Sequence, residues 1–309
     1  LDPPYFTGQN SSVRSDLIPV SSFSKQSAKI SQPKSRDCSR DKLTDKSIIL
    51  FSKRLYHMQE KKSENVIKGG CKNEQQKKQY LQQLFTNTYI LDIKERYDIR
   101  NDDDLEELIN VIASSIGGLT NPTKIANTFS STKQSNISKD TIKNYLDHMQ
   151  DAFLIEKAIR YDIKGRKYID TPTKYYFEDL GLRNARLNFR QIEPTHLMEN
   201  LIYNELRIRG YSIDVGQVVI NSRNEKGISE RKNLEVDFVC NKGYDRIYIQ
   251  SAYEMPTLEK QEQELNSLKR IKDNFQKIII VGGMQPTYRN NDGILILNLY
   301  DFLLNKVTI

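Results

Sequence analysis

The sequence has no tryptophan, and its 309 residues include only three cysteines and three histidines. Cys38, Cys71 and Cys240 are odd in number and far apart, which excludes a disulfide framework and a cysteine-rich zinc site. So few histidines also argue against a histidine-based metal cluster. Because no run of about 18 apolar residues occurs and no signal peptide opens the chain, we expect a cytoplasmic protein that does not contact a membrane.

A phosphate-binding loop is also missing. The segment Gly69-Gly70-Cys71-Lys72 does not fit the spacing G-x-x-x-x-G-K-S/T, since the first glycine is absent and no serine or threonine follows the lysine. We therefore assign no residue to ATP binding and expect no cofactor. No combination of Ser, His and Asp, or of Cys and His, points to nucleophilic catalysis.

The net charge and the length of the chain restrict its partners and its number of domains only loosely. The chain has 47 Lys and Arg against 40 Asp and Glu, a net charge of +7, which favours a polyanionic partner, although dispersed charge gives the same sum. Only 37 % of residues are hydrophobic, which indicates that part of the chain does not pack. We place that part at residues 1–46, a Ser-, Lys-, Gln- and Pro-rich segment expected to be disordered or unrelated to the rest. The length predicts two domains or three small ones.

The middle of the chain predicts a winged helix-turn-helix. A helix over about 74–87 continues as an apolar and charged strip to Arg96. Three helices then follow, over 105–116, from Asn121-Pro122, and over about 138–152. Two strands, 153–161 and 168–177, flank the turn Lys164-Gly165-Arg166, and this order is typical of a winged helix.

In that interpretation, the third helix would face DNA and the strand turn would form the wing. Lysine, arginine and asparagine side chains suit contacts with phosphates and base edges. Winged helices also serve as protein–protein modules, so DNA and a protein partner both stay open. The expected DNA-binding residues are Lys139, Lys143, Asn144, Lys164, Arg166 and Lys167.

The last part, about 190–309, predicts a mixed α/β sheet. A helix over about 195–209 precedes strands at 212–220, 234–240 and 246–252, a helix at 259–275, and strands at 277–281 and 294–299. In the segment from Leu234 to Phe238, the period of 2 places Leu234, Val236 and Phe238 on one face and Glu235 with Asp237 on the other.

The polar residues of this part resemble the PD-(D/E)xK nuclease core, in which carboxylates hold Mg²⁺ and a lysine assists the attacking water. Glu199 and Asp237 are the candidate metal ligands, and Gln250 and Lys260 complete the candidate catalytic set. Gln250-Ser251-Ala252 stands where an active core would have Glu-x-Lys. Because the second carboxylate and the ammonium are missing there, we expect a degenerate site rather than a nuclease.

Several motifs in order resemble the C-terminal part of a bacterial and archaeal AAA+ P-loop ATPase family. They run from about residue 65 to the end of the chain. They include Tyr80-Leu81 with Leu84-Phe85, Asp92-Ile93 with Arg96, Asn121-Pro122-Thr123-Lys124-Ile125-Ala126, Lys174-Tyr175-Tyr176-Phe177, Asp179 with Gly181-Leu182-Arg183-Asn184, Glu199-Asn200, and Glu235-Val236-Asp237-Phe238-Val239.

The resemblance implies a winged helix followed by a restriction-endonuclease-like domain of unknown function. It also implies that residues 47–100 are the remnant of an AAA+ module, ahead of a winged-helix domain at 101–185 and the nuclease-like domain at 190–309. Intact relatives would bind ATP. We expect this chain to be a non-catalytic fragment that binds DNA or a protein partner, with a Mg²⁺-dependent nuclease, or ATP binding by family alone, as the alternatives.

Overall fold

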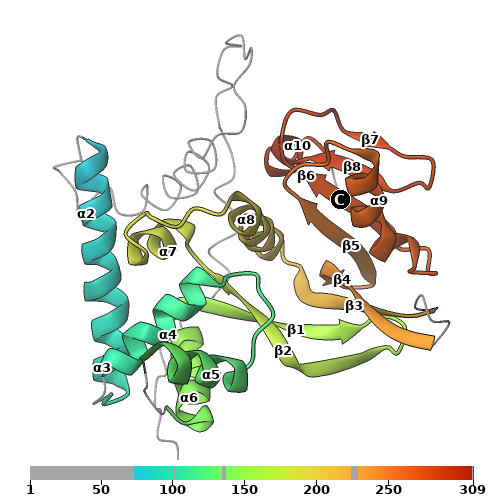
Figure 1. The fold of residues 1–309 in the computed structure, drawn as a ribbon. Helices are drawn as coiled ribbons and strands as arrows, with labels where there is room; N and C mark the ends of the chain where they lie inside the picture. Colours follow the sequence, from blue (N-terminus) through green and yellow to red (C-terminus); the bar gives the residue numbers. More distant parts are fainter. Residues whose placement is uncertain (1–72, 100–101, 134–136, 224–228, 308) are drawn as a thin grey trace, which may run out of the picture. The chain divides into compact units, whose positions relative to one another are not determined.

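The computed structural model describes residues 73–99, 102–133, 137–223, 229–307 and 309. Our predictions for residues 1–46, and for the 47–72 part of the remnant module, lie outside the described residues. The described chain begins with three helical segments in succession, and the side chain of Asn73 accepts the N–H of Gln76 at their start. These are α2 (Glu74–Leu84), the π-helix η2 (Phe85–Ile90) and α3 (Leu91–Arg96) (Figure 1). The sequence predicted the helix and its continuation to Arg96, but not the π-helical turns between them.

Three further helices and a hairpin follow in the predicted order. Asn121 accepts the N–H of Lys124 and Pro122 lies in the first turn of its helix, while Ser138 accepts the N–H of Thr141. Local capping thus fixes where two of the three helices begin. The elements are α4 (Asp102–Ser114), α5 (Pro122–Lys133), α6 (Lys139–Asp151), β1 (Ile155–Asp162) and β2 (Lys167–Phe177).

The remainder is a mixed α/β region. The elements are α7 (Leu180–Arg186), α8 (Pro194–Ile208), β3 (Ser212–Arg223), β4 (Ser229–Lys242), β5 (Asp245–Ala252), α9 (Leu258–Lys269), β6 (Gln276–Val281), β7 (Tyr288–Arg289), β8 (Leu295–Asn298) and α10 (Leu299–Leu303). The sequence did not predict α7, β7 or α10. The sequence also predicted that the α9 helix extends to Phe275. In the structure this helix ends at Lys269, and the next residues lead into β6, with Ile271 buried under the sheet.

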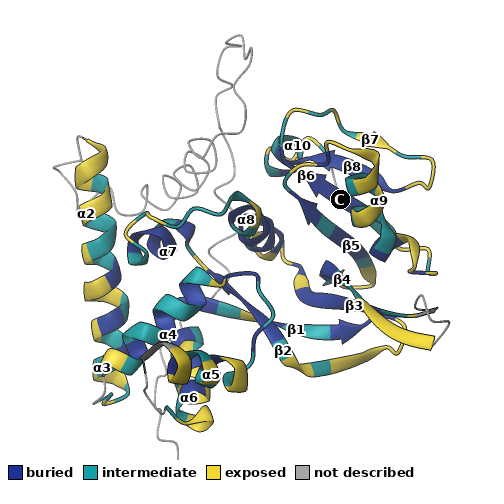
Figure 2. Ribbon diagram, in the orientation of Figure 1, coloured by how far each residue is buried: buried dark blue, intermediate teal, exposed yellow. Residues whose placement is uncertain are grey.

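All described strands form one sheet in the order β2-β1-β3-β4-β5-β6-β8-β7. From β3 to β6 the strands are neighbours in chain order, with β4 antiparallel to β3 and β5, and β6 parallel to β5. Side chains of α8 and α10 pack on one face and those of α9 on the other. This confirms the predicted mixed sheet flanked by helices, and Figure 2 shows how fully its central strands and α8 are buried.

The predicted wing is part of this sheet. Arg160–Asp162 of β1 pair in parallel with Val215–Gln217 of β3, and the Arg160 side chain donates to Gln217. The regions predicted as separate domains, 101–185 and 190–309, therefore share one continuous set of strands. No pattern in the sequence indicated this pairing. No helix in the described part of the chain is both long and apolar enough to cross a bilayer.

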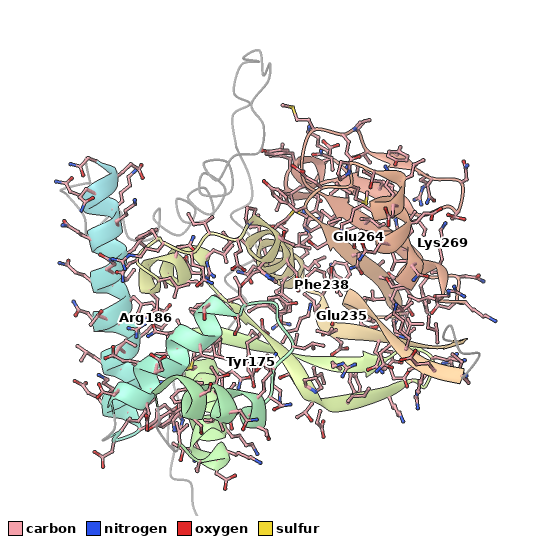
Figure 3. The ribbon with its side chains drawn as sticks, in the orientation of Figure 1. Tyr175, Arg186, Glu235, Phe238, Glu264 and Lys269 are labelled. Atoms are coloured by element: carbon pink, nitrogen blue, oxygen red, sulfur yellow. The ribbon has the colours of Figure 1, made fainter. Side chains whose placement is uncertain are left out.

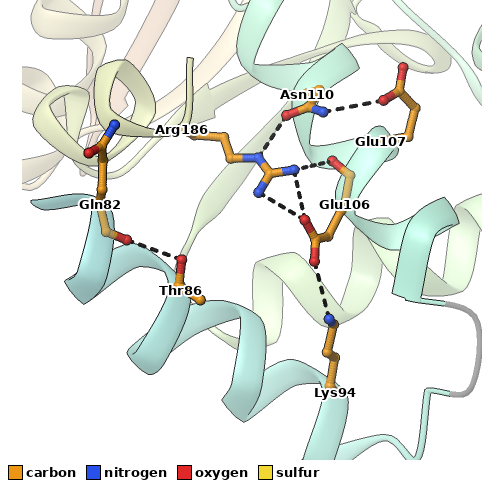
Figure 4. Close-up of polar contacts among 7 residues, drawn as sticks. All are labelled: Gln82, Thr86, Lys94, Glu106, Glu107, Asn110 and Arg186. Atoms are coloured by element: carbon orange, nitrogen blue, oxygen red, sulfur yellow. Dashed lines mark hydrogen bonds and ion pairs between the residues drawn. The ribbon is translucent and has the colours of Figure 1, made fainter. Parts of the chain in front are cut away.

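Two arginines of α7 attach this short helix to α4. Arg186 donates to the side chain of Asn110 at 2.7 Å and to the backbone and carboxylate of Glu106, which also accepts from Lys94 of α3 (Figure 4). Arg183 is completely buried and donates to the carbonyl oxygens of Ala113 and Gln191, each at 2.7 Å. Charged hydrogen bonds therefore hold α3, α4 and α7 together around an apolar core.

We predict that Arg183→Met lowers the free energy of unfolding by about 2–4 kcal/mol, because it leaves buried carbonyl oxygens without donors. Urea denaturation followed by circular dichroism measures the change. Arg190→Met makes the same substitution at an exposed position and should change stability by no more than about 0.5 kcal/mol. Equal effects of the two substitutions would contradict this role for Arg183.

Candidate functional site

A buried lysine lies among three carboxylates in the place where the sequence predicted a nuclease site. The Nζ atom of Lys174, on β2, is 2.8 Å from Glu199 Oε1 on α8. It is 2.6 Å from Glu235 Oε1 and 3.8 Å from Asp237 Oδ1, both on β4. The Lys174 side chain is 3 % exposed. The ammonium group therefore joins the hairpin, α8 and β4 at one point.

An irregularity in β4 brings both of its carboxylates to the face of α8. Val236 packs in the apolar cluster under α9, whereas Phe238 packs in the cluster with Tyr176 under α8. The pairing of β3 with β4 shifts register between Asp214 and Gly216. Such a bulge lets two successive residues lie on one face. The prediction that Val236 and Phe238 share a face was wrong for this reason, although Glu235 and Asp237 do lie together.

Neighbouring groups close this pocket around Glu199. The hydroxyl of Tyr176, which is completely buried, donates to Glu199 Oε1 at 2.7 Å. Gly117, in the turn after α4, lies so close that a Cβ atom added there would be 3.2 Å from the Glu199 carboxylate. Its φ of +70° is also one that residues other than glycine rarely adopt. Asp237 Oδ2 accepts the backbone N–H of Ser251 at 2.8 Å.

The charged groups of the pocket shift one another's pKa values. Burial alone would lower the pKa of Lys174, but the carboxylates of Glu199, Asp237 and Glu235 outweigh it and hold that pKa above its ordinary value. Burial, together with the charge of Glu199, raises the pKa of Asp237 to about 8, although Lys174 opposes the shift. At neutral pH the Lys174 ammonium is therefore charged, and Asp237 loses its proton at a higher pH than an ordinary aspartate does.

These residues do not fit a divalent cation. The positive nitrogen of Lys174 already lies between the carboxylates of Glu199 and Asp237, the two predicted metal ligands. An ammonium this close to both carboxyl groups repels Mg²⁺, and it already occupies Glu199 Oε1 as a hydrogen-bond donor. Within the ranges that the structure describes, no group of three or more His, Cys, Asp or Glu side chains is arranged to hold a metal ion.

The other two candidate catalytic residues lie on the opposite face of the sheet. Ile249 packs under α8 while Tyr248 and Ala252 pack under α9, so the alternation of β5 directs Gln250 toward α9. The Gln250 amide is 3.4 Å from Glu264 on that helix, and Lys260 pairs with the same Glu264. Figure 3 labels Glu264 on α9, and Glu235 and Phe238 on β4. The backbone N–H of Asp237, 3.4 Å from Gln250 Oε1, is one contact between the two groups.

Sequence reasoning missed Lys174. Its segment, Lys174-Tyr175-Tyr176-Phe177, entered only as one motif of a resemblance, because it lies in the predicted wing and far along the chain from Glu199. The signal that could have identified it is a lysine inside an otherwise aromatic, buried strand, since a buried lysine needs an anionic partner. Chemically the arrangement is a largely buried ion cluster of one ammonium and three carboxyl groups.

The predicted DNA-binding residues fall into two separate groups. Lys139, Lys143 and Asn144 are exposed on α6, which precedes β1, whereas Lys164, Arg166 and Lys167 are exposed at the turn where β1 ends (Figure 1). The exposed face of α6 also carries three aspartates, and Tyr97 covers part of the helix by stacking on His148 at 3.6 Å. Charge therefore does not favour α6 as a surface for DNA. The three aspartates are Asp140, Asp147 and Asp151.

The turn group contributes to a large basic cleft. This cleft, of about 1550 Å³, is formed by the end of the hairpin, β3, β4, the β4–β5 turn and the loop after α9. Six basic and three acidic side chains line it. We call it the basic cleft, and its basic residues are Lys164, Arg166, Arg231, Arg246, Arg270 and Lys272.

Comparison with known proteins gives relatives but no activity. Residues 70–193 match the family described as Domain of unknown function (DUF8612). An uncharacterised protein of Haemophilus influenzae is 34 % identical over 228 residues, which cover 74 % of this chain and 52 % of the relative. The uncharacterised protein MJ1544 of Methanocaldococcus jannaschii is 30 % identical over 199 residues, covering 64 % of this chain and 41 % of the relative.

The chain thus spans about half the length, or less, of these curated relatives. The crystal structure of protein VC1899 from Vibrio cholerae aligns with 76 % of this chain and 55 % of its own, with a TM-score of 0.27 and 14 % sequence identity. None of these descriptions names an ATPase. The resemblance to the AAA+ family stays a prediction.

We predict that the wild-type chain loses stability relative to Asp237→Asn as the pH rises from about 5 to 8. The pKa of Asp237, about 8 in the folded chain, is about 4 when unfolded, so folding takes up a proton in this window and the free energy of unfolding falls as pH rises. The substitution removes that titration but keeps an acceptor for the N–H of Ser251. Urea denaturation across this pH range gives the comparison, and parallel curves for the two proteins would contradict the prediction.

Proposed function

We propose that this chain binds nucleic acid without cleaving it. The observation that carries the proposal is the convergence of six basic side chains on one cleft, where Lys164 and Lys272 are exposed and have no described ion-pair partner. The cleft holds six basic side chains but only three acidic ones, Asp162, Asp245 and Asp273. The cleft therefore offers more positive charge than its own acids neutralise, which suits a row of phosphates.

The Lys174 cluster supports the proposal that the chain does not cleave the nucleic acid it binds. Phosphodiester cleavage of the PD-(D/E)xK type needs a divalent ion whose ligands are free carboxylates. Here the carboxylates of Glu199, Glu235 and Asp237 surround an ammonium group instead. The nuclease-like fold would then serve as a binding scaffold. ATP binding, which the AAA+ resemblance implies for intact relatives, is proposed for no residue of this chain.

Two matched double variants test the binding surface. Lys164→Ala with Lys272→Ala removes two charges from the cleft, and Lys139→Ala with Lys143→Ala removes two from α6. We expect the cleft variant to weaken DNA binding at least about tenfold and to reduce the salt dependence by about 0.7–0.9 per lost phosphate contact. The α6 variant should bind like wild type. Fluorescence anisotropy titrations from low to physiological salt measure both quantities.

Three outcomes would overturn this assignment. Equal losses in the two double variants would mean that net charge alone matters, and a greater loss in the α6 variant would restore the winged-helix interpretation. Wild-type affinity that does not fall with salt would favour a protein partner over nucleic acid. All four substituted lysines are exposed and make no described ion pair, so the variants should fold alike.

A cleavage assay separately tests the proposal that the chain does not cleave nucleic acid. We expect no product when the chain is incubated with single- or double-stranded DNA and Mg²⁺ or Mn²⁺. Cleavage that disappears in Asp237→Asn would show that the alternative, a metal-dependent nuclease, is correct. Cleavage that persists in this variant would indicate a contaminating enzyme, and a repeat on a further-purified sample that gives no product would then support the proposal.

A further inference from the structure

One aromatic residue at the basic cleft has no structural role in the described chain. Tyr244 lies in the turn between β4 and β5, lines the cleft, and is fully exposed, at 103 % of its reference area. The preceding Gly243, with a φ of +61°, shapes this tight turn. A large ring held in water on a rigid turn gains nothing from folding, because its apolar surface is not removed from solvent. A single exposed ring is ordinary on a protein surface, but this ring lies beside six basic side chains of one cleft, where it is accessible to a ligand.

Further aromatic rings and a guanidinium form one wall of the same cleft. The guanidinium carbon of Arg246 lies 5.0 Å from the ring centre of Tyr161 and 5.8 Å from that of Phe275. Arg246 is held by Asn241, to which it donates at 2.7 Å, and Phe275 is 42 % exposed. Arg246 is therefore held in place, and the wall presents the half-exposed ring of Phe275 next to positive charge.

The dimensions and the walls suit a polymer. At about 1550 Å³ the cleft exceeds the 300–1,000 Å³ typical of small-molecule pockets, and it is open to solvent along strand ends and turns. Strands and turns line most of it. In a duplex the base faces are stacked on one another and cannot reach Tyr244 or Phe275.

We infer that the basic cleft binds single-stranded nucleic acid, with bases stacked on Tyr244 and Phe275 and phosphates held by the surrounding lysines and arginines. Stacking is independent of sequence because every base has a flat face, so we expect little sequence preference. This inference rests on the proposed function, since it specifies the class of nucleic acid that the cleft takes.

Three single variants test the stacking step. The probe is a labelled oligothymidine of about 12 nucleotides, and a hairpin duplex of similar charge is the comparison. We expect Tyr244→Ala to weaken oligothymidine binding about 5- to 100-fold and to leave the weaker duplex binding unchanged. Tyr244→Phe keeps the ring and should bind like wild type. Tyr288→Ala removes a half-exposed aromatic ring from β7, outside the cleft, and should also have no effect.

The outcomes separate this inference from the proposed function. If the chain binds DNA but Tyr244→Ala matches wild type, or the duplex binds as tightly as the single strand, single-strand recognition is wrong while the proposed function stands. If neither probe binds, the proposed function itself fails. If the oligothymidine binds, an oligouridine of equal length shows whether the sugar matters. Tighter binding of either strand still supports a single-strand site and identifies the strand as DNA or RNA.

Discussion

The Lys174 ammonium imposes the strictest requirement on the fold. A buried lysine is stable only when anions surround it, and its three partners come from α8 and β4 while it belongs to β2. Four features must therefore agree in position: the hairpin beside β3, α8 across the sheet, the bulge in β4 and the Gly117 turn against Glu199. The same contacts that make the pocket unsuitable for a metal ion hold the hairpin, α8 and β4 together.

Much of the secondary structure could be predicted because its signals are local. Asn73, Asn121 and Ser138 cap their helices through contacts three residues away, and the apolar periods of α4 and α6 correspond to their buried faces. Short elements such as α7 and α10 carry too few residues to show a period. The partner of β1 could not be predicted either, since parallel pairing with β3 joins residues more than 50 positions apart.

The candidate site was predicted in part. Glu199 and Asp237 do meet, as the order of helix and strand suggested, because each lies on the face where α8 packs. Gln250 and Lys260 do not join them, since the bulge in β4 changes which of its residues share a face and Gln250 follows the unbroken alternation of β5. The alternation of apolar and polar residues along a strand does not reveal an inserted residue. It also gives no information about a lysine that belongs to another strand.

The pairing of β1 with β3 has a consequence for dividing this protein into pieces. A fragment that began near residue 190, at the boundary suggested by the sequence, would leave β3 as an edge strand with unpaired N–H and C=O groups along Val215–Gln217. Exposed edges of this kind pair with other chains, which leads to aggregation. The same cut would remove the counter-ion of Glu199, Glu235 and Asp237 and leave three carboxylates crowded together. The smallest part that can fold by itself therefore includes the hairpin.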